Sequence, residues 1–107
     1  MAAPARLTEL GLDPTCGNRA NWRCDLLGET DVGALESGLA ARGYAVRCRH
    51  PNLRIFRRDD GHEVAWVLST GRVQLRIPFQ VSRQDRESAA RKVYADIEGV
   101  LQSASDI

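Results

Sequence analysis

Hydrophobic and polar residues alternate most clearly at residues 72 to 77. The apolar positions are Val73, Leu75 and Ile77, and the polar positions are Arg72, Gln74 and Arg76. Because successive side chains of a strand point to opposite faces of a sheet, this pattern predicts a strand with one apolar and one polar face. Thr70-Gly71 precedes it and predicts a tight turn from an apolar segment. We therefore expect a β-hairpin whose second strand presents a polar face.

Short apolar segments separated by turn residues predict four consecutive strands, at 44–49, 53–58, 63–69 and 72–79. The residues expected in the turns are His50-Pro51-Asn52, Asp59-Asp60-Gly61 and Thr70-Gly71. Pro78 has no N–H to donate to a neighbouring strand, which indicates a strand end or an edge. A further short strand is expected earlier in the chain, at 21–27.

A helix is expected at 31–42, where apolar residues recur at spacings of three and four. These residues are Val32, Leu35 and Leu39. Thr30 or Asp31 can cap the first turn by accepting a hydrogen bond from a backbone N–H. Gly43 can take the left-handed conformation in which helices commonly end.

A longer helix is expected from about residue 82 to near the C-terminus. Ser82 can cap its start, and Asp85 three residues later completes a pattern close to a capping box. Its apolar stripe consists of Ala90, Val93, Tyr94, Ile97, Leu101 and Ala104. Because each helix has only one apolar stripe to bury, both are expected to cover the same face of the sheet.

The predicted element order is β-α-β-β-β-β-α, and the hairpin connections make the sheet antiparallel. This is an α+β fold with two helices on one face of the sheet. The chain has 107 residues, which is enough for a single core. We therefore expect one α+β domain at 21–107, preceded by an irregular N-terminal arm at 1–20.

Composition is that of an ordinary globular domain, with 43% hydrophobic and 27% charged residues. No apolar run approaches the ~20 residues of a membrane span, and the first ten residues lack the basic start and apolar stretch of a signal peptide. We therefore expect a cytoplasmic protein without a membrane partner. Cys16, Cys24 and Cys48 fit that compartment, because an odd number of cysteines makes a poor disulfide framework.

The second half of the chain resembles one repeat of the TATA-box-binding protein fold. The segment LSTGRVQLRI is similar to the family's hairpin, and SRQDRESAARKVYADIEGVL is similar to its last helix. The matching helix residues are Ala89, Ala90, Arg91, Lys92 and Tyr94. The resemblance covers roughly residues 21 to 102. It implies a curved antiparallel sheet, a single half of the family's saddle, and DNA or another nucleic acid as the partner.

The positions at which the family opens the DNA minor groove differ in this chain. Asp25 stands where the family has a groove-binding asparagine, and Leu68 stands where it has a wedging phenylalanine. Gln74 and Arg76 stand at apolar and threonine positions of the groove-facing strand. We therefore expect weak binding with little sequence preference, to single strands or to duplex, rather than recognition of a TATA sequence.

The polar face of the sheet is the candidate binding site. Alternation and the resemblance place on it Arg54, Phe56, Arg58, Trp66, Leu68, Arg72, Gln74 and Arg76. Cations together with aromatic rings suit phosphate contacts and base stacking, which favours a non-catalytic module that binds nucleic acid. The same mixture suits a protein-interaction adaptor or a self-associating module. A solvated face partly covered by the arm is the third interpretation.

The arginines are concentrated in the part of the chain that forms this face. Residues 44 to 81 hold seven arginines, and their only acids are Asp59, Asp60 and Glu63 around one turn. The net charge is only +1, so the distribution of charge rather than its total indicates an anionic partner. Lys92 is the only lysine, so the codon usage of a GC-rich genome is an alternative source of the arginines.

Neither a metal site nor an active site is predicted. The cysteines, His50 and His62 lack the closely paired spacing of structural zinc sites, although Cys48 and His50 would share a strand face. The acids and histidine at 59–63 are typical of a hairpin tip. The chain has no nucleophile elbow, phosphate-binding glycine loop or zinc-protease motif. We therefore expect no cofactor, and binding rather than catalysis.

The strand at 21–27 would form an edge of the sheet. Unpaired backbone groups on an edge strand invite pairing with another chain. We therefore predict a homodimer, with this edge as one possible contact. The arm at 1–20 could instead cover the edge and leave a monomer.

Overall fold

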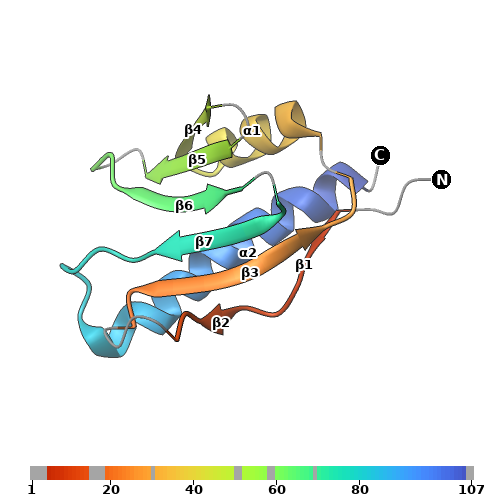
Figure 1. Cartoon of the computed structure of the whole chain (residues 1–107). Coiled ribbons are helices and arrows are strands. Elements are labelled where there is room, and N and C mark those ends of the chain that lie inside the picture. The colour runs from red at the N-terminus through yellow and green to blue at the C-terminus, as the bar shows by residue number, and fades with distance from the viewer. Residues whose placement is uncertain are drawn as a thin grey trace.

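The computed structural model describes residues 5–14, 19–29, 31–49, 52–57, 60–68 and 70–105. Figure 1 shows how its strands and helices are arranged. In chain order the elements are β1 (Arg6–Leu7), β2 (Gly11–Leu12), β3 (Asn21–Leu27), α1 (Val32–Ala41), β4 (Tyr44–Arg49), β5 (Asn52–Arg57), β6 (Glu63–Val67), β7 (Arg72–Arg76), the 3-10 turn η1 (Arg83–Asp85) and α2 (Arg86–Ser105).

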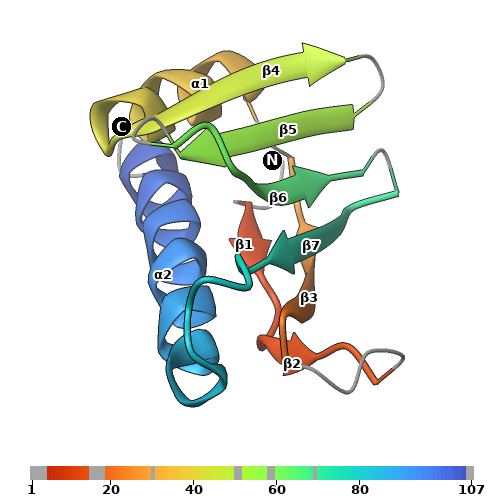
Figure 2. The same cartoon turned by 90° about the vertical axis from the view of Figure 1, so that its left-hand side faces the viewer.

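The sheet is antiparallel, with strand order β1-β3-β7-β6-β5-β4 and with β2 also paired with β3. Strands β4 to β7 follow one another as hairpins, and β3 lies beside β7 although α1 and three strands separate them in the chain. Both helices cover the same face of the curved sheet and leave the other face without a helix (Figures 1 and 2). The predicted α+β fold is confirmed, and the element order from β3 to α2 broadly matches the prediction; β1 and β2, in the arm expected to be irregular, and η1 are additional.

Helix α1 begins and ends as its sequence predicts. The Asp31 carboxylate accepts a hydrogen bond from the N–H of Ala34 at 3.2 Å, and Gly43 follows the helix with a φ of 92°. Of the predicted apolar face, Leu35 and Leu39 are buried, whereas Val32 in the first turn is 43% exposed. The helix therefore packs through its second and third turns.

The start of α2 differs from the prediction. The Ser82 side chain does not cap the helix; its Oγ donates to the Asp85 carboxylate at 2.8 Å, and the N–H of Asp85 donates to the carbonyl of Ser82 at 2.9 Å. These contacts form η1, after which α2 begins at Arg86. Of the predicted apolar stripe, Ala90, Val93, Ile97 and Leu101 are buried and Tyr94 is half-buried; Val100, which was not predicted, is buried as well.

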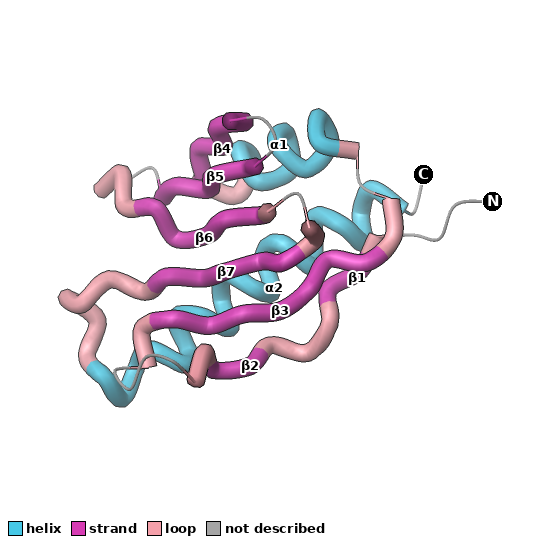
Figure 3. Tube along the Cα trace, viewed as in Figure 1, coloured by secondary structure: helices cyan, strands magenta, loops and turns pink. Residues whose placement is uncertain are grey.

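The N-terminal arm lies along β3. Its residues 5–14 contain the two-residue strands β1 and β2 joined by a loop (Figure 3), and both strands pair with β3. Leu7 and Leu10 are buried in the core, and the hydroxyl of Tyr94 on α2 donates to the carbonyl of Thr8 at 2.8 Å. The edge of β3 on which the homodimer prediction depended is therefore already paired within the chain.

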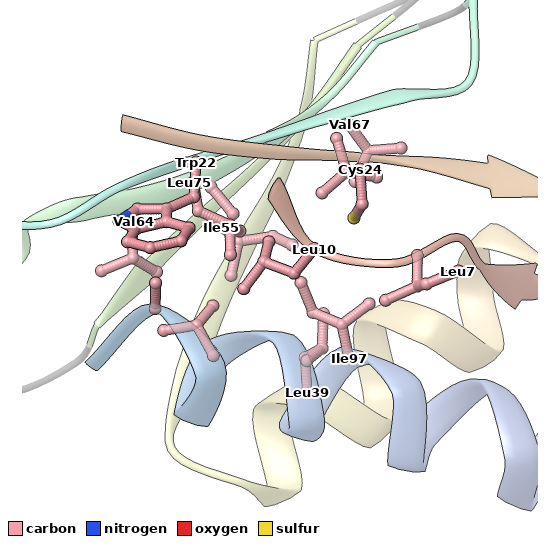
Figure 4. Packing of buried hydrophobic residues seen from close by; sticks show 14 of the residues in the cluster. Leu7, Leu10, Trp22, Cys24, Leu39, Ile55, Val64, Val67, Leu75 and Ile97 are labelled. Carbon is pink, nitrogen blue, oxygen red and sulfur yellow. The ribbon is translucent and has the colours of Figure 1, made fainter. Parts of the chain in front are cut away.

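The core lies between the sheet and the two helices (Figure 4). Trp22, Ile55 and Leu75 extend from the strands toward Leu39 and Ile97 of the helices, and each of the five is at most 3% exposed. In the part of the chain that the structure describes, no helix combines the length and apolar character needed to cross a membrane.

A β-bulge lies in the middle of the sheet. Ile55 opposes Ala65, whereas the next residue, Phe56, opposes Glu63, so Val64 is the additional residue on β6. Val64 and Ala65 are both buried, although they are neighbours in the chain. Because a bulge bends its strand and increases the local twist, it contributes to the curvature of the sheet.

Candidate functional site

The face of the sheet that carries no helix is the outer face, and the alternation predicted for β7 places polar residues on it. Val73 and Leu75 are each 1% exposed and belong to the core. Arg72, Gln74 and Arg76 lie between and beside them and are exposed. The polar side of this strand is therefore free of the helices and open to a partner.

Strand pairing brings residues from five strands into one line across the outer face. Gln74 is opposite Arg23 on one side and opposite Trp66 on the other. Beyond Trp66 the line continues through the backbone of Arg54 to Arg47 on β4. Arg23 and Arg47 are exposed, and Trp66 is half-buried. We call this line the Trp66 row; its members are Arg23, Gln74, Trp66, Arg54 and Arg47.

A pocket of about 260 Å³ lies beside Trp66. Its lining residues are Asp13, Asn21, Trp22, Trp66, Gln74, Leu75 and Arg76. Trp22 and Leu75 belong to the core, while the other five carry an aromatic ring, two amides, a carboxylate and a guanidinium. The pocket therefore combines an indole surface with hydrogen-bond donors and hydrogen-bond acceptors.

Charges of both signs occur on this face. Asp25 on β3 is exposed and lies opposite Arg72 in the register of the two strands. Its backbone N–H donates to the hydroxyl of Thr8 at 2.8 Å, which ties this part of β3 to the arm. Asp25 therefore reduces the positive potential at the Arg72 end of the face, whereas the Trp66 row has no acid.

The predicted site residues are brought together to different extents. Arg72, Gln74 and Arg76 are exposed on β7, and Trp66 and Leu68 are half-buried. Arg54 and Phe56 lie on β5 with side chains outside the described part of the structure, and Arg58 lies outside the described residues. A binding role for these eight residues stays a prediction.

Sequence reasoning missed the contributions of β3, β4 and the arm. Arg23, Arg47, Asn21 and Asp13 were not among the expected site residues. On β3 a signal exists, because Asn21, Arg23 and Asp25 alternate with the buried Trp22 and Cys24. Nothing local to residue 13 indicates that an acid from the arm reaches this pocket.

Cys24 lies on the inner side of β3 and is 5% exposed (Figure 4). Burial, and then the nearby charges of Asp25 and Glu98, raise the pKa of its thiol to about 11. Within the described ranges, no three His, Cys, Asp or Glu residues gather closely enough to hold a metal ion. Cys16 and His50 lie outside those ranges, as does the Cys48 side chain.

The acidic turn between β5 and β6 has a local structural role where the structure describes it. The Asp60 carboxylate accepts a hydrogen bond from the N–H of His62 at 2.9 Å. Nε2 of His62 lies 3.2 Å from the carbonyl oxygen of Arg76, to which it donates when it carries a proton. These contacts order the turn beside the end of β7, as expected for a hairpin tip.

Comparisons of the chain with protein-family models, curated proteins and solved structures found no match.

Proposed function

We propose that this domain binds single-stranded nucleic acid across the outer face of its sheet, through arginine contacts to phosphates and base stacking on Trp66. The Trp66 row is the observation that carries the proposal. It places exposed Arg23 and Arg47 at its two ends, with the half-buried indole of Trp66 between them. An aromatic platform flanked by cations is the arrangement used to bind single strands with little sequence preference.

The dimensions of the row support a strand that runs across the sheet. Neighbouring strands lie ~4.8 Å apart, so the four spacings from Arg23 to Arg47 separate their backbones by about 19 Å. Guanidinium groups bind phosphate oxygens in a planar fork and stay charged at neutral pH. A bound strand can therefore contact a cation on each side of the stacked base.

We further propose that the domain is a single repeat related to the TATA-box-binding protein fold. The element order from β3 to α2 and the placement of both helices on one face support this relationship. Asp25 and Leu68, at positions where that family opens the minor groove, favour single strands over kinked duplex.

The proposal is tested by fluorescence anisotropy with labelled oligonucleotides at several salt concentrations. Arg23→Ala/Arg47→Ala, which removes the cations at the two ends of the Trp66 row, should weaken binding to all sequences and reduce the logarithmic salt slope by about 0.7 for each phosphate that the variant no longer neutralises. Arg91→Ala/Lys92→Ala is the control, because it removes two exposed cations from α2 on the other side of the sheet.

Three results would count against the proposal. No binding at tens of micromolar in low salt would exclude nucleic acid as the partner. Equal losses of affinity in both double variants would show that net charge, rather than the outer face, controls binding. Binding that is insensitive to salt would favour the protein-interaction adaptor, since apolar docking releases no counterions.

A further inference from the structure

We infer that the pocket beside Trp66 receives a guanine base of the bound strand. This inference rests on the proposed function and adds a base preference to it. The pocket contains Asp13, whose carboxylate repels phosphate, so the pocket is suited to a base rather than to the backbone. Trp66 supplies the surface on which the base stacks.

Strand pairing places an acidic and a basic side chain on opposite sides of this pocket. The N–H of Asp13 donates to the carbonyl of Asn21 at 2.9 Å, and Asn21 is paired with Arg76. Asp13 and Arg76 therefore flank β3 at a backbone separation of about two strand spacings, or about 10 Å. The side chains of both residues line the pocket, together with those of Asn21 and Gln74.

Guanine matches this pair of groups better than the other bases. The two oxygens of a carboxylate can each accept a hydrogen bond from one of two neighbouring donors. Guanine is the only one of the bases that presents such a pair, N1–H and the N2 amino group. Arginine is the common bidentate partner of guanine O6 and N7. Cytosine offers one amino group as donor, adenine likewise offers one, and thymine or uracil offers a single ring N–H. Guanine is therefore the base that can use Asp13 and Arg76 together.

The test uses oligothymidine strands that carry one central guanine, adenine or cytosine, compared by anisotropy with the all-thymine strand. The wild-type protein should bind the guanine strand about tenfold more tightly than the others, as expected for one bidentate contact. Asp13→Asn should abolish this preference, because an amide offers one acceptor oxygen in place of two.

Glu36→Gln is the matched control, since it removes the same charge from an exposed position on α1, away from the outer face. It should keep the tenfold preference. Thermal melting of each variant shows whether it is folded. Trp66→Phe retains an aromatic ring, so it should keep the preference for guanine at reduced affinity.

The outcomes separate the inference from the proposed function. If the wild-type protein binds all four strands equally with a steep salt slope, the guanine pocket is wrong and the proposed function stands. A preference that survives Asp13→Asn overturns the role of this carboxylate. If no strand binds at low salt, both the inference and the proposed function are wrong.

Discussion

The thiol of Cys24 is protonated in the folded protein over a wider pH range than an ordinary thiol. Its pKa rises from 9.0 to about 11, mainly because burial disfavours the thiolate and further because Asp25 and Glu98 repel it. The folded state therefore binds this proton more tightly than the unfolded state. The corresponding stabilisation is complete below pH 9 and is lost as the pH rises toward 11.

We predict that the free energy of unfolding of a Cys16→Ser/Cys48→Ser variant declines between pH 9 and 11 in urea titrations, partly because Cys24 ionises. Adding Cys24→Ala should make that decline shallower. Tyr94, whose pKa is raised mainly by burial and further by nearby charges that include Cys24, titrates in both proteins, so the difference reports Cys24 together with its effect on Tyr94. Identical pH profiles would contradict the assigned environment of the thiol.

Helices α1 and α2 cross at a glycine. A Cβ built on Gly38 would lie 2.5 Å from Cγ1 of Val100, which is 4% exposed and belongs to the core. The branched side chain of valine has little rotamer freedom in a helix, so it cannot move aside cheaply. The absence of a side chain at Gly38 therefore sets how closely the two helices approach.

We predict that Gly38→Ala destabilises the protein by about 1–2 kcal/mol, because overpacking costs ~1–3 kcal/mol and the gain in helix propensity offsets at most ~1 kcal/mol. Urea or thermal unfolding measures the change.

Gly99→Ala is the control: its Cβ would meet the mobile guanidinium of Arg42 at 2.7 Å, which can rotate away. The ion pair of Arg42 with Asp96 spans 3.7 Å and contributes little, so this variant should be neutral or slightly stabilised. A Gly38→Ala protein as stable as Gly99→Ala would contradict the close helix crossing.

The regular elements could be predicted from sequence because each has a local period or a local end signal. The observed bounds of β3 and β4 equal those expected, and those of α1 differ by one residue at each end, where Asp31 and Gly43 define it. The two-residue strands of the arm are too short to show an alternation of apolar and polar residues. The extra residue Val64 depends on cross-strand pairing, which no local pattern reports.

The candidate site was predictable only in part, because much of it depends on pairing between strands that no local pattern reports. Alternation on β7 identified Arg72, Gln74 and Arg76 as one face of a strand. The pairing of Gln74 with Arg23 joins residues 51 positions apart, so it depends on how the whole sheet assembles. The pocket further requires the arm to bring Asp13 beside β3.

The arm joins the two layers of the molecule and covers one edge of the sheet. Three contacts of Thr8 hold it in place: its N–H donates to the carbonyl of Asp25, its hydroxyl accepts from the N–H of Asp25, and its carbonyl accepts from the Tyr94 hydroxyl. Each of these distances is 2.8 Å. The arm therefore protects β3 from pairing with another chain, and the predicted homodimer requires its release or a different contact.

We predict that Thr8→Pro promotes self-association, because proline has neither the N–H nor the hydroxyl that bind the arm to β3, and an uncovered edge strand invites pairing. Sedimentation equilibrium should give a mass near 11.8 kDa for the wild-type protein and a mass that increases with concentration for the variant.

Thr8→Ala retains the backbone N–H and should behave as the wild-type protein. Amide hydrogen exchange at Asp13 reports whether the arm has opened, since its N–H donates to the carbonyl of Asn21 on β3 and neither substitution removes that bond directly. Fast exchange at Asp13 in Thr8→Pro without any increase in mass would show that the β3 edge does not pair with a second copy. A wild-type protein that is already a dimer would place its interface elsewhere on the molecule.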